Sequence, residues 1–246
     1  MQNYIEQKFR ELGINPDTAN YVFFWSAQPK VHGVVDESCC CQWWVEHFTF
    51  DGVRFRTAEH AMMYSKAKLF NAPHIMKQVL EVYHPRDAKK LGRQVKTFNK
   101  QVWERHDYDI VKNISIQKFT QLKRLNQWLL GHPDNTIFVE ASPYDEIWGI
   151  QLANDGKVDL TNYRNWKGLN KLGFALTEVF QQLQMNHSNK NESGIPENTV
   201  ISDAETAQWL ADTINTPAST NPKLREAAEQ FSKVRNGEIK LDLKLS

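Results

Sequence analysis

Hydrophobic and polar residues follow several distinct patterns along this chain, and each pattern predicts a different element. The first segment, "NYIEQKFREL", has helical spacing, whereas "YVFFW" (21–25) is a short run typical of a buried strand. "HFTFDGVRFR" alternates on both sides of Asp51-Gly52, which is the strongest short signal for a β-hairpin. "TIFVEA" (136–141) is the clearest isolated strand. An irregular loop is expected between about 26 and 41.

The middle of the chain is mostly helical by the same criterion. The spacing predicts helices over about 58–70, 72–83, from 85 onward, 99–130 in two pieces, and 168–185. Thr57 is placed to cap the first of these, and Asn71 the second. Gly131-His132-Pro133 ends the long pair of helices.

Composition changes at Asn186 and divides the chain. We expect residues 1–186 to form one domain and residues 187–246 to form a polar linker followed by a short C-terminal helical extension. The tail carries seven Lys/Arg against nine Asp/Glu, so it is not a basic arm.

Composition and charge narrow the classes of function. The chain has 246 residues, eight Trp and a net charge of +1, so any contact with nucleic acid would be a local patch. No apolar run approaches the roughly 20 residues that span a bilayer, and the first residues do not resemble a signal peptide, so a cytoplasmic protein without membrane association is expected. The three cysteines are consecutive, a spacing that suits neither a disulfide framework nor a zinc site, and no metal is expected.

The stretch "RTAEHAMMYSKAKLF" (56–70) places a carboxylate and an amine on one face of a helix. Glu59 and Lys66 are seven residues apart, nearly two full turns, which separates them by about 10.5 Å along the axis. Met62 and Met63 lie between them. The helix is either a core-facing element with two incidental charges or one wall of a site.

Reactive or stacking side chains also gather at three other places where a loop meets a regular element. The residues are Trp43 and Trp44 before the hairpin, Arg93 and Trp103 around "LGRQVKTFNKQVW", and Asp145 and Trp148 in "VEASPYDEIWGI", where Glu140 also lies. Each has a structural alternative: a core tryptophan, a carboxylate that complements the helix dipole, a solvated lysine, or an aspartate that caps a turn.

Together these residues suit a ligand with a planar base, a sugar and a phosphate. Arginine clamps a phosphate, and tryptophan stacks on a base or a ribose. Carboxylates assist cleavage of a glycosidic carbon, and a neutral lysine can instead attack that carbon to give an imine. Residue chemistry alone indicates a nucleotide-sugar site and leaves both routes open.

The same motifs resemble those of the NADAR (NAD and ADP-ribose) family, the YbiA-like proteins. They occur in the family's order over about 20–185: "YVFFW", "QWW", "TAEHAMMYSKAKLF", "AKKLGR", Trp103, "KF" at 118–119, "VEASPYDEIWGI" and "WKGLNKLG". The resemblance implies a compact, mainly helical α+β domain with a small hairpin and strand element. It also implies hydrolysis of N-glycosidic bonds without a cofactor.

The resemblance assigns roles to particular residues. Carried over by motif, Glu59, Lys66 and Asp145 are catalytic, and the substrate-binding residues are Trp43, Trp44, Arg93, Trp103, Trp148 and Gly149. Two departures stand out: relatives commonly read "WGIG" where this chain has "WGIQ", with Gln151, and the stretch before Gln42 is rich in cysteine. Gln151 is expected to alter the rim of the pocket.

The resemblance implies two enzymatic functions, and a third, non-enzymatic function is the alternative to both. The first is release of ADP-ribose from guanine in nucleic acid or nucleotides, which would reverse the modification made by guanine-specific toxins and make a toxin a possible partner. The second is cleavage of ribosylamino-pyrimidine phosphates of early riboflavin synthesis, which needs no nucleic-acid surface. The third is binding of ADP-ribose or NAD without cleavage, although a pure binding module has no need of Glu59, Lys66 and Asp145 together.

Overall fold

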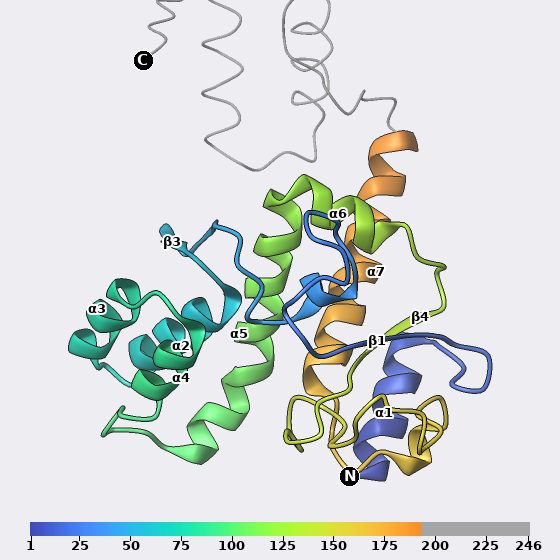
Figure 1. Ribbon diagram of the computed structural model, residues 1–246, viewed down its shortest axis with the longest axis horizontal. Helices are drawn as coiled ribbons and strands as arrows, with labels where there is room; N and C mark the ends of the chain where they lie inside the picture. Colours follow the sequence, from blue (N-terminus) through green and yellow to red (C-terminus); the bar gives the residue numbers. More distant parts are fainter. Residues whose placement is uncertain (193–246) are drawn as a thin grey trace, which may run out of the picture. The chain divides into compact units, whose positions relative to one another are not determined.

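The computed structural model describes residues 1–192 (Figure 1). The chain divides into two compact units, residues 1–186 and 187–246, and the site lies in the first. The short helical extension predicted after the linker lies outside the described residues. Among those described, no helix combines the length and the apolar character needed to cross a membrane.

The first unit is mainly helical and contains two small sheets, which confirms the predicted α+β class. The helices are α1 (Gln2–Leu12), α2 (Ala58–Leu69), α3 (Pro73–Glu81), α4 (Pro85–Gly92), α5 (Lys100–Gln121), α6 (Lys123–Leu130) and α7 (Lys171–Glu192). Two 3₁₀ turns, η1 (Glu37–Cys40) and η2 (Tyr163–Asn165), lie in the long loops. The strands are β1 (Asn20–Phe24), β2 (Phe48–Phe50), β3 (Val53–Phe55) and β4 (Thr136–Glu140).

Strands β1 and β4 are parallel and lie between two hydrophobic cores (Figure 1). Ile137 and Val139 point into the core that contains Phe9 of α1, whereas Phe138 points into the core shared by α2, α5 and α7. Successive side chains of a strand alternate between faces, so a strand buried on both faces has a continuous apolar sequence. This explains why "TIFV" is a clear signal. The carboxyl ends of both strands meet at one edge, with Phe24 opposite Glu140.

The hairpin and the helix after it form as the sequence predicts. Asp51 and Gly52 both have positive φ, 52° and 74°, as a type I′ turn requires between β2 and β3. The Thr57 hydroxyl accepts the His60 N–H and caps α2. Met62 and Met63 are buried, and a Cβ on Gly92 would overlap the Met63 side chain, so α2 and α4 pack closely.

Two expected boundaries differ from the structure. Asn71 does not cap α3: it has φ 49°, and α3 begins after Ala72 with Pro73 at its first position. Asparagine tolerates the left-handed region, so it allows the chain to turn out of α2. The last helix begins at Lys171 because Asn170 also has a left-handed φ of 53°, and it continues to Glu192.

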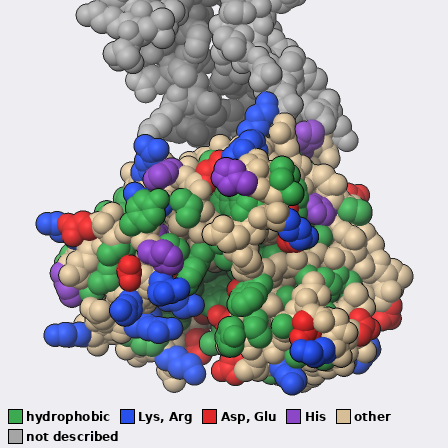
Figure 2. All heavy atoms as spheres, viewed as in Figure 1, with side chains coloured by type: hydrophobic (Ala, Val, Ile, Leu, Met, Phe, Trp, Pro, Cys, Tyr) green, Lys and Arg blue, Asp and Glu red, His purple; other side chains and the backbone are tan. Residues whose placement is uncertain are grey.

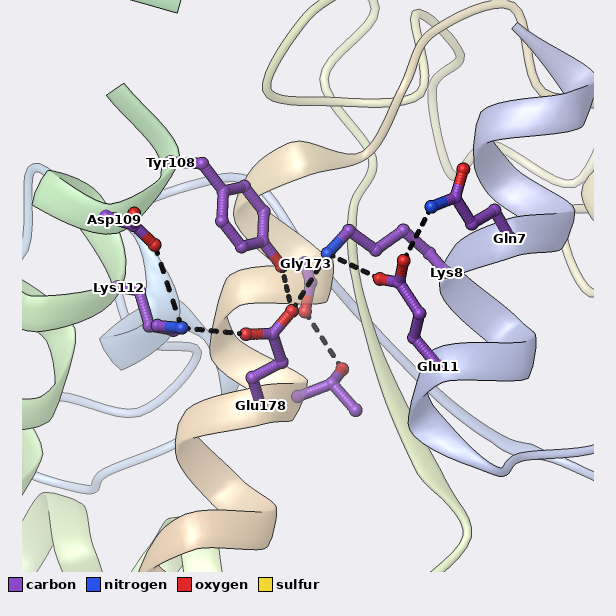
Figure 3. Close-up of polar contacts among 9 residues, drawn as sticks. Gln7, Lys8, Glu11, Tyr108, Asp109, Lys112, Gly173 and Glu178 are labelled. Carbon is purple, nitrogen blue, oxygen red and sulfur yellow. Dashed lines mark hydrogen bonds and ion pairs between the residues drawn. The ribbon is translucent and has the colours of Figure 1, made fainter. Parts of the chain in front are cut away.

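A polar network joins α1, α5 and α7 (Figure 3). The Glu178 carboxylate on α7 accepts hydrogen bonds from Lys8 (3.0 Å), Tyr108 (2.6 Å) and Lys112 (3.2 Å). Burial alone would raise the pKa of Glu178, but the bonds from Tyr108 and Lys8 outweigh it and hold that pKa below its usual value. The network therefore holds these three helices together.

Candidate active site

Glu59 is a buried carboxyl group at the start of α2. Its side chain is only 5% exposed, and its Oε2 accepts a hydrogen bond of 3.2 Å from the Trp43 indole N–H. Its second oxygen, Oε1, is buried without a partner. Burial raises the pKa of Glu59, and the charges of Lys89 and Arg93 oppose that rise. An unpaired buried carboxyl oxygen costs free energy unless a ligand or water meets it, so Oε1 marks a point of contact.

Lys66 lies two turns along the same helix, beside the aromatic rings of Phe98 and Trp103. Its Nζ is 4.1 Å from the centre of the Phe98 ring and 5.6 Å from that of the buried Trp103. Burial lowers the pKa of Lys66, and the nearby Arg93 guanidinium lowers it further, while Glu59 opposes the change. A lysine with a lowered pKa is more readily neutral, which is what a nucleophilic amine requires.

Helix α4 supplies two cations to this group. Lys89 is half-buried and lowers the pKa of Glu59, and Arg93, exposed at the end of the helix, does the same more weakly. Figure 2 shows a hollow beside α4, with Lys and Arg side chains along the α4 side, hydrophobic side chains on the opposite rim and acidic atoms between them. The hollow is therefore polarised, with positive charge on one wall.

The loop after β4 contributes Asp145 and Trp148. Asp145 Oδ1 accepts the backbone N–H groups of Ile147 (3.0 Å) and Trp148 (2.8 Å), so this aspartate does cap a turn. Its charge also raises the pKa of Glu59, because the two carboxylates repel each other. Asp145 thus caps a turn, as the structural alternative predicted, and also lies close enough to Glu59 to raise its pKa.

Trp148 is held from behind by a buried ion pair. Lys171 Nζ lies 5.3 Å from the centre of the Trp148 ring and donates a 2.6 Å hydrogen bond to Asp107 on α5. The side chains of Lys171 and Asp107 are 12% and 3% exposed. The pair connects the start of α7 and α5 to the Trp148 ring, which is itself half-buried.

The two neighbouring tryptophans before the hairpin have different surroundings. Trp43 bonds to Glu59, and its ring meets His84 edge-on at 5.8 Å. Trp44 instead donates its indole N–H to Glu46 at 3.0 Å and packs against the core. Trp43 therefore contacts the predicted catalytic residue Glu59, whereas Trp44 is bound to Glu46.

Four side chains near this group were not assigned to the site from the sequence. Glu140, at the end of β4, raises the pKa of Glu59's neighbour Cys41 and is itself affected by Glu59, Asp145 and Lys89. Lys89 and Phe98 meet Glu59 and Lys66 only through tertiary packing, so no local pattern indicates them. Trp25, half exposed directly after β1, packs on Tyr144 with ring centres 6.1 Å apart. For Glu140 and Trp25 a signal exists: both stand at the carboxyl ends of predicted strands, where binding residues collect.

The cysteine-rich stretch is held by a buried lysine. Lys118 Nζ donates to the carbonyl oxygens of Cys39 (2.6 Å) and Cys41 (3.2 Å), and burial lowers its pKa. Cys39 and Cys40 are buried free thiols. Within residues 1–192, no group of three or more His, Cys, Asp or Glu has the arrangement of a metal site.

Gly149 permits the close approach of the loop to the end of β4. A Cβ at this position would lie 2.8 Å from the Glu140 carbonyl oxygen and 3.1 Å from that of Asp145. Gly149→Ala should therefore push the Asp145–Trp148 turn away from the strand and lower the free energy of unfolding by about 1–3 kcal/mol, as overpacking does. Urea denaturation measures the change, and Gly131→Ala, whose Cβ would meet no atom closer than 3.3 Å, is the control. Equal stability of the two variants would contradict this account.

Comparisons with known proteins show to which family this chain belongs. A family model described as the NADAR domain matches residues 23–184. The chain is 36% identical over 173 residues to N-glycosidase R617 of Acanthamoeba polyphaga mimivirus, a match that covers 68% of this chain and 99% of that protein. It is 33% identical over 134 residues to protein irg-1 of Caenorhabditis elegans, covering 53% of this chain and 62% of that protein.

A solved structure has the same fold. The NMR structure of the E. coli protein YbiA matches with a TM-score of 0.55 and 22% identity, over 69% of this chain and 88% of that one. The family model covers more than half of the 246 residues, and it includes every residue of the Glu59 group. The chain therefore belongs to the NADAR domain family, as its motifs indicated.

Proposed function

We propose that this protein is an N-glycosidase that releases ADP-ribose from ADP-ribosylated guanine, in nucleic acid or in nucleotides. The reaction class is the one named for its 36% identical relative. The observation that carries the proposal is that Glu59 and Lys66 lie on one helix face. The Glu59 carboxyl group has a buried oxygen without a partner, and the Lys66 amine lies over the Phe98 and Trp103 rings.

The hollow has the parts that such a substrate requires. Arg93 and Lys89 supply positive charge close to Glu59, which would neutralise the pyrophosphate, and arginine binds such groups through two parallel hydrogen bonds. Trp103 is buried beneath Lys66, so the half-buried Trp148 and Trp43 are the rings left to stack on the base or the ribose. Asp145, whose Oδ1 is held by two backbone N–H groups, offers its other oxygen to a ribose hydroxyl.

Hydrolysis needs a stabilised cationic sugar carbon and an activated nucleophile. The Glu59 carboxylate lies in a buried position, where it stabilises positive charge on the anomeric carbon more strongly than an exposed carboxylate would. The same group accepts the proton of an attacking water. Lys66 contributes either positive charge toward the phosphates or, when neutral, a nucleophilic amine.

The test is release of free ADP-ribose from a DNA oligonucleotide that carries ADP-ribosyl-guanine, followed by chromatography. We expect release with a first-order dependence on enzyme concentration. Tight binding of ADP-ribose without release would favour a binding module instead. Absence of both would overturn the proposal and make the ribosylamino-pyrimidine phosphates the substrates to assay next.

A further inference from the structure

We propose that Glu140 is the general acid of this site, which protonates the base nitrogen as the glycosidic bond breaks; the inference rests on the proposed N-glycosidase function. No motif assigned this role to Glu140. Its position at the end of β4, its unpaired buried oxygen and the charged groups around it support this role.

Hydrogen bonds of its N–H and carbonyl groups hold the backbone of Glu140 and fix the position of its Cα. Its N–H donates to Asn170 Oδ1 (3.0 Å), and its carbonyl oxygen accepts the Ile150 N–H (2.9 Å). It is also paired with Phe24 in the parallel ladder. A catalytic side chain must be positioned to within about half an ångström, and regular elements achieve this better than loops.

The carboxyl group itself has no hydrogen-bond partner for its buried oxygen. Glu140 Oε2 is buried and unpaired, like Glu59 Oε1. Two such oxygens on neighbouring carboxyl groups are unusual, because most buried polar atoms in proteins are paired. Both carboxyl groups lie close enough to Asp145 and Lys89 for those charges to shift their pKa values, and the Glu59 charge also acts on Glu140.

The surrounding charges determine which carboxyl group keeps a proton. Burial raises the pKa of Glu140 to about 8, with further increases from Asp145 and Glu59 and opposition from Lys89. Glu59 is stabilised as an anion by more groups: Lys89, the Trp43 N–H and Arg93. Glu140 therefore holds its proton more firmly, and Glu59 is the carboxyl group that ionises more readily. Two carboxyl groups in different environments divide the roles of acid and base in this way.

The step balances with these two groups. The bond from the anomeric carbon to the base nitrogen breaks, its electron pair moves to the nitrogen, and the nitrogen takes the Glu140 proton. A water oxygen bonds to the carbon, and the proton that it loses moves to Glu59. Exchange with solvent then returns a proton to Glu140 and removes one from Glu59. If Lys66 attacks instead of water, the departing nitrogen needs the same proton.

The experiment compares single-turnover cleavage by wild type and Glu140→Gln between pH 5 and pH 10. Glutamine keeps the shape of the side chain but has no proton to transfer. We expect the wild-type rate to fall above pH 8 and the variant to be slower by about 100-fold or more, without that alkaline decline. ADP-ribose affinity should change by less than about threefold. The control is Glu146→Gln, an exposed residue of the same loop.

A measurement without substrate separates this inference from the proposed function. In protein labelled with ¹³C at the glutamate carboxyl carbons, the signal missing from Glu140→Gln should titrate near pH 8 in wild type. Titration at the ordinary value for glutamate, or a variant that cleaves at the wild-type rate, overturns the role of Glu140. An inactive wild type overturns the proposed function instead.

Discussion

Replacing Glu59 by glutamine is expected to abolish cleavage while the protein stays folded and binds ADP-ribose. The amide oxygen still accepts the 3.2 Å hydrogen bond from Trp43, so the indole keeps its partner. The variant loses the negative charge that stabilises the cationic sugar carbon and the group that accepts the water proton. Loss of a general base alone costs about 10²–10⁴-fold in rate, and the lost charge adds to it.

The control for this experiment is present in the chain. Glu46 also accepts an indole N–H, that of Trp44 at 3.0 Å, but its other contact is the exposed Arg124 at 3.7 Å. Glu46→Gln makes the same chemical change at a second tryptophan–glutamate pair and should leave the rate within about twofold. If both variants lose activity equally, or if Glu59→Gln unfolds at a clearly lower urea concentration, Glu59 is a structural residue.

Elements with a local cause were predictable from the sequence. The Thr57 cap, the Asp51-Gly52 turn and the apolar strand 136–140 each depend on residues within one element, and each forms where it was predicted. Resemblance to a family then supplied the order of the motifs. The residues that only tertiary packing brings to the site, Lys89 and Phe98, have no such local cause.

The backbone at Gln151 lies in the left-handed region, which is unusual for a residue other than glycine. The sequence suggested that a side chain here would alter the rim of the pocket. In the structure Gln151 has φ 53°, and its N–H donates to the Asp145 carbonyl oxygen at 3.2 Å. Glycine adopts this conformation at no cost, whereas other residues lose roughly 1–2 kcal/mol. A glycine at this position would adopt the turn without strain, whereas this chain adopts it with a side chain present, next to Asp145.

Among the site residues, too, some features follow from the local sequence and others depend on tertiary packing. Glu59 and Lys66 were placed on one face by helical periodicity, which α2 confirms, but their burial depends on elements far away in sequence. Glu140 illustrates the limit most clearly. Its position at the end of a strand can be predicted from "TIFVEA". Its unpaired oxygen and its raised pKa depend on burial by the rest of the fold, and Asp145 and Glu59 raise that pKa further.

Replacing Lys66 by methionine should lower the cleavage rate by about 100-fold or more, whichever route the reaction takes. As an electrostatic group, Lys66 stabilises negative charge in the substrate, and preorganised charges of this kind contribute about 10²–10³-fold. As a nucleophile, its amine forms the intermediate, and its pKa is already lowered by burial and by Arg93. Methionine retains the apolar contact with Phe98, so the fold should persist.

Lys68→Met provides the matched control, because it makes the same change two residues later on the same helix. Lys68 is exposed and forms an ion pair with Asp51 in the hairpin turn, whereas Lys66 contacts the Phe98 ring. Its loss should leave the rate within about twofold, so comparable loss in both variants would contradict a role for Lys66. Borohydride during turnover then separates the two routes: a stable ADP-ribose adduct on Lys66 by mass spectrometry assigns attack by the amine. With cleavage but no adduct, water is the nucleophile and Lys66 acts through its charge.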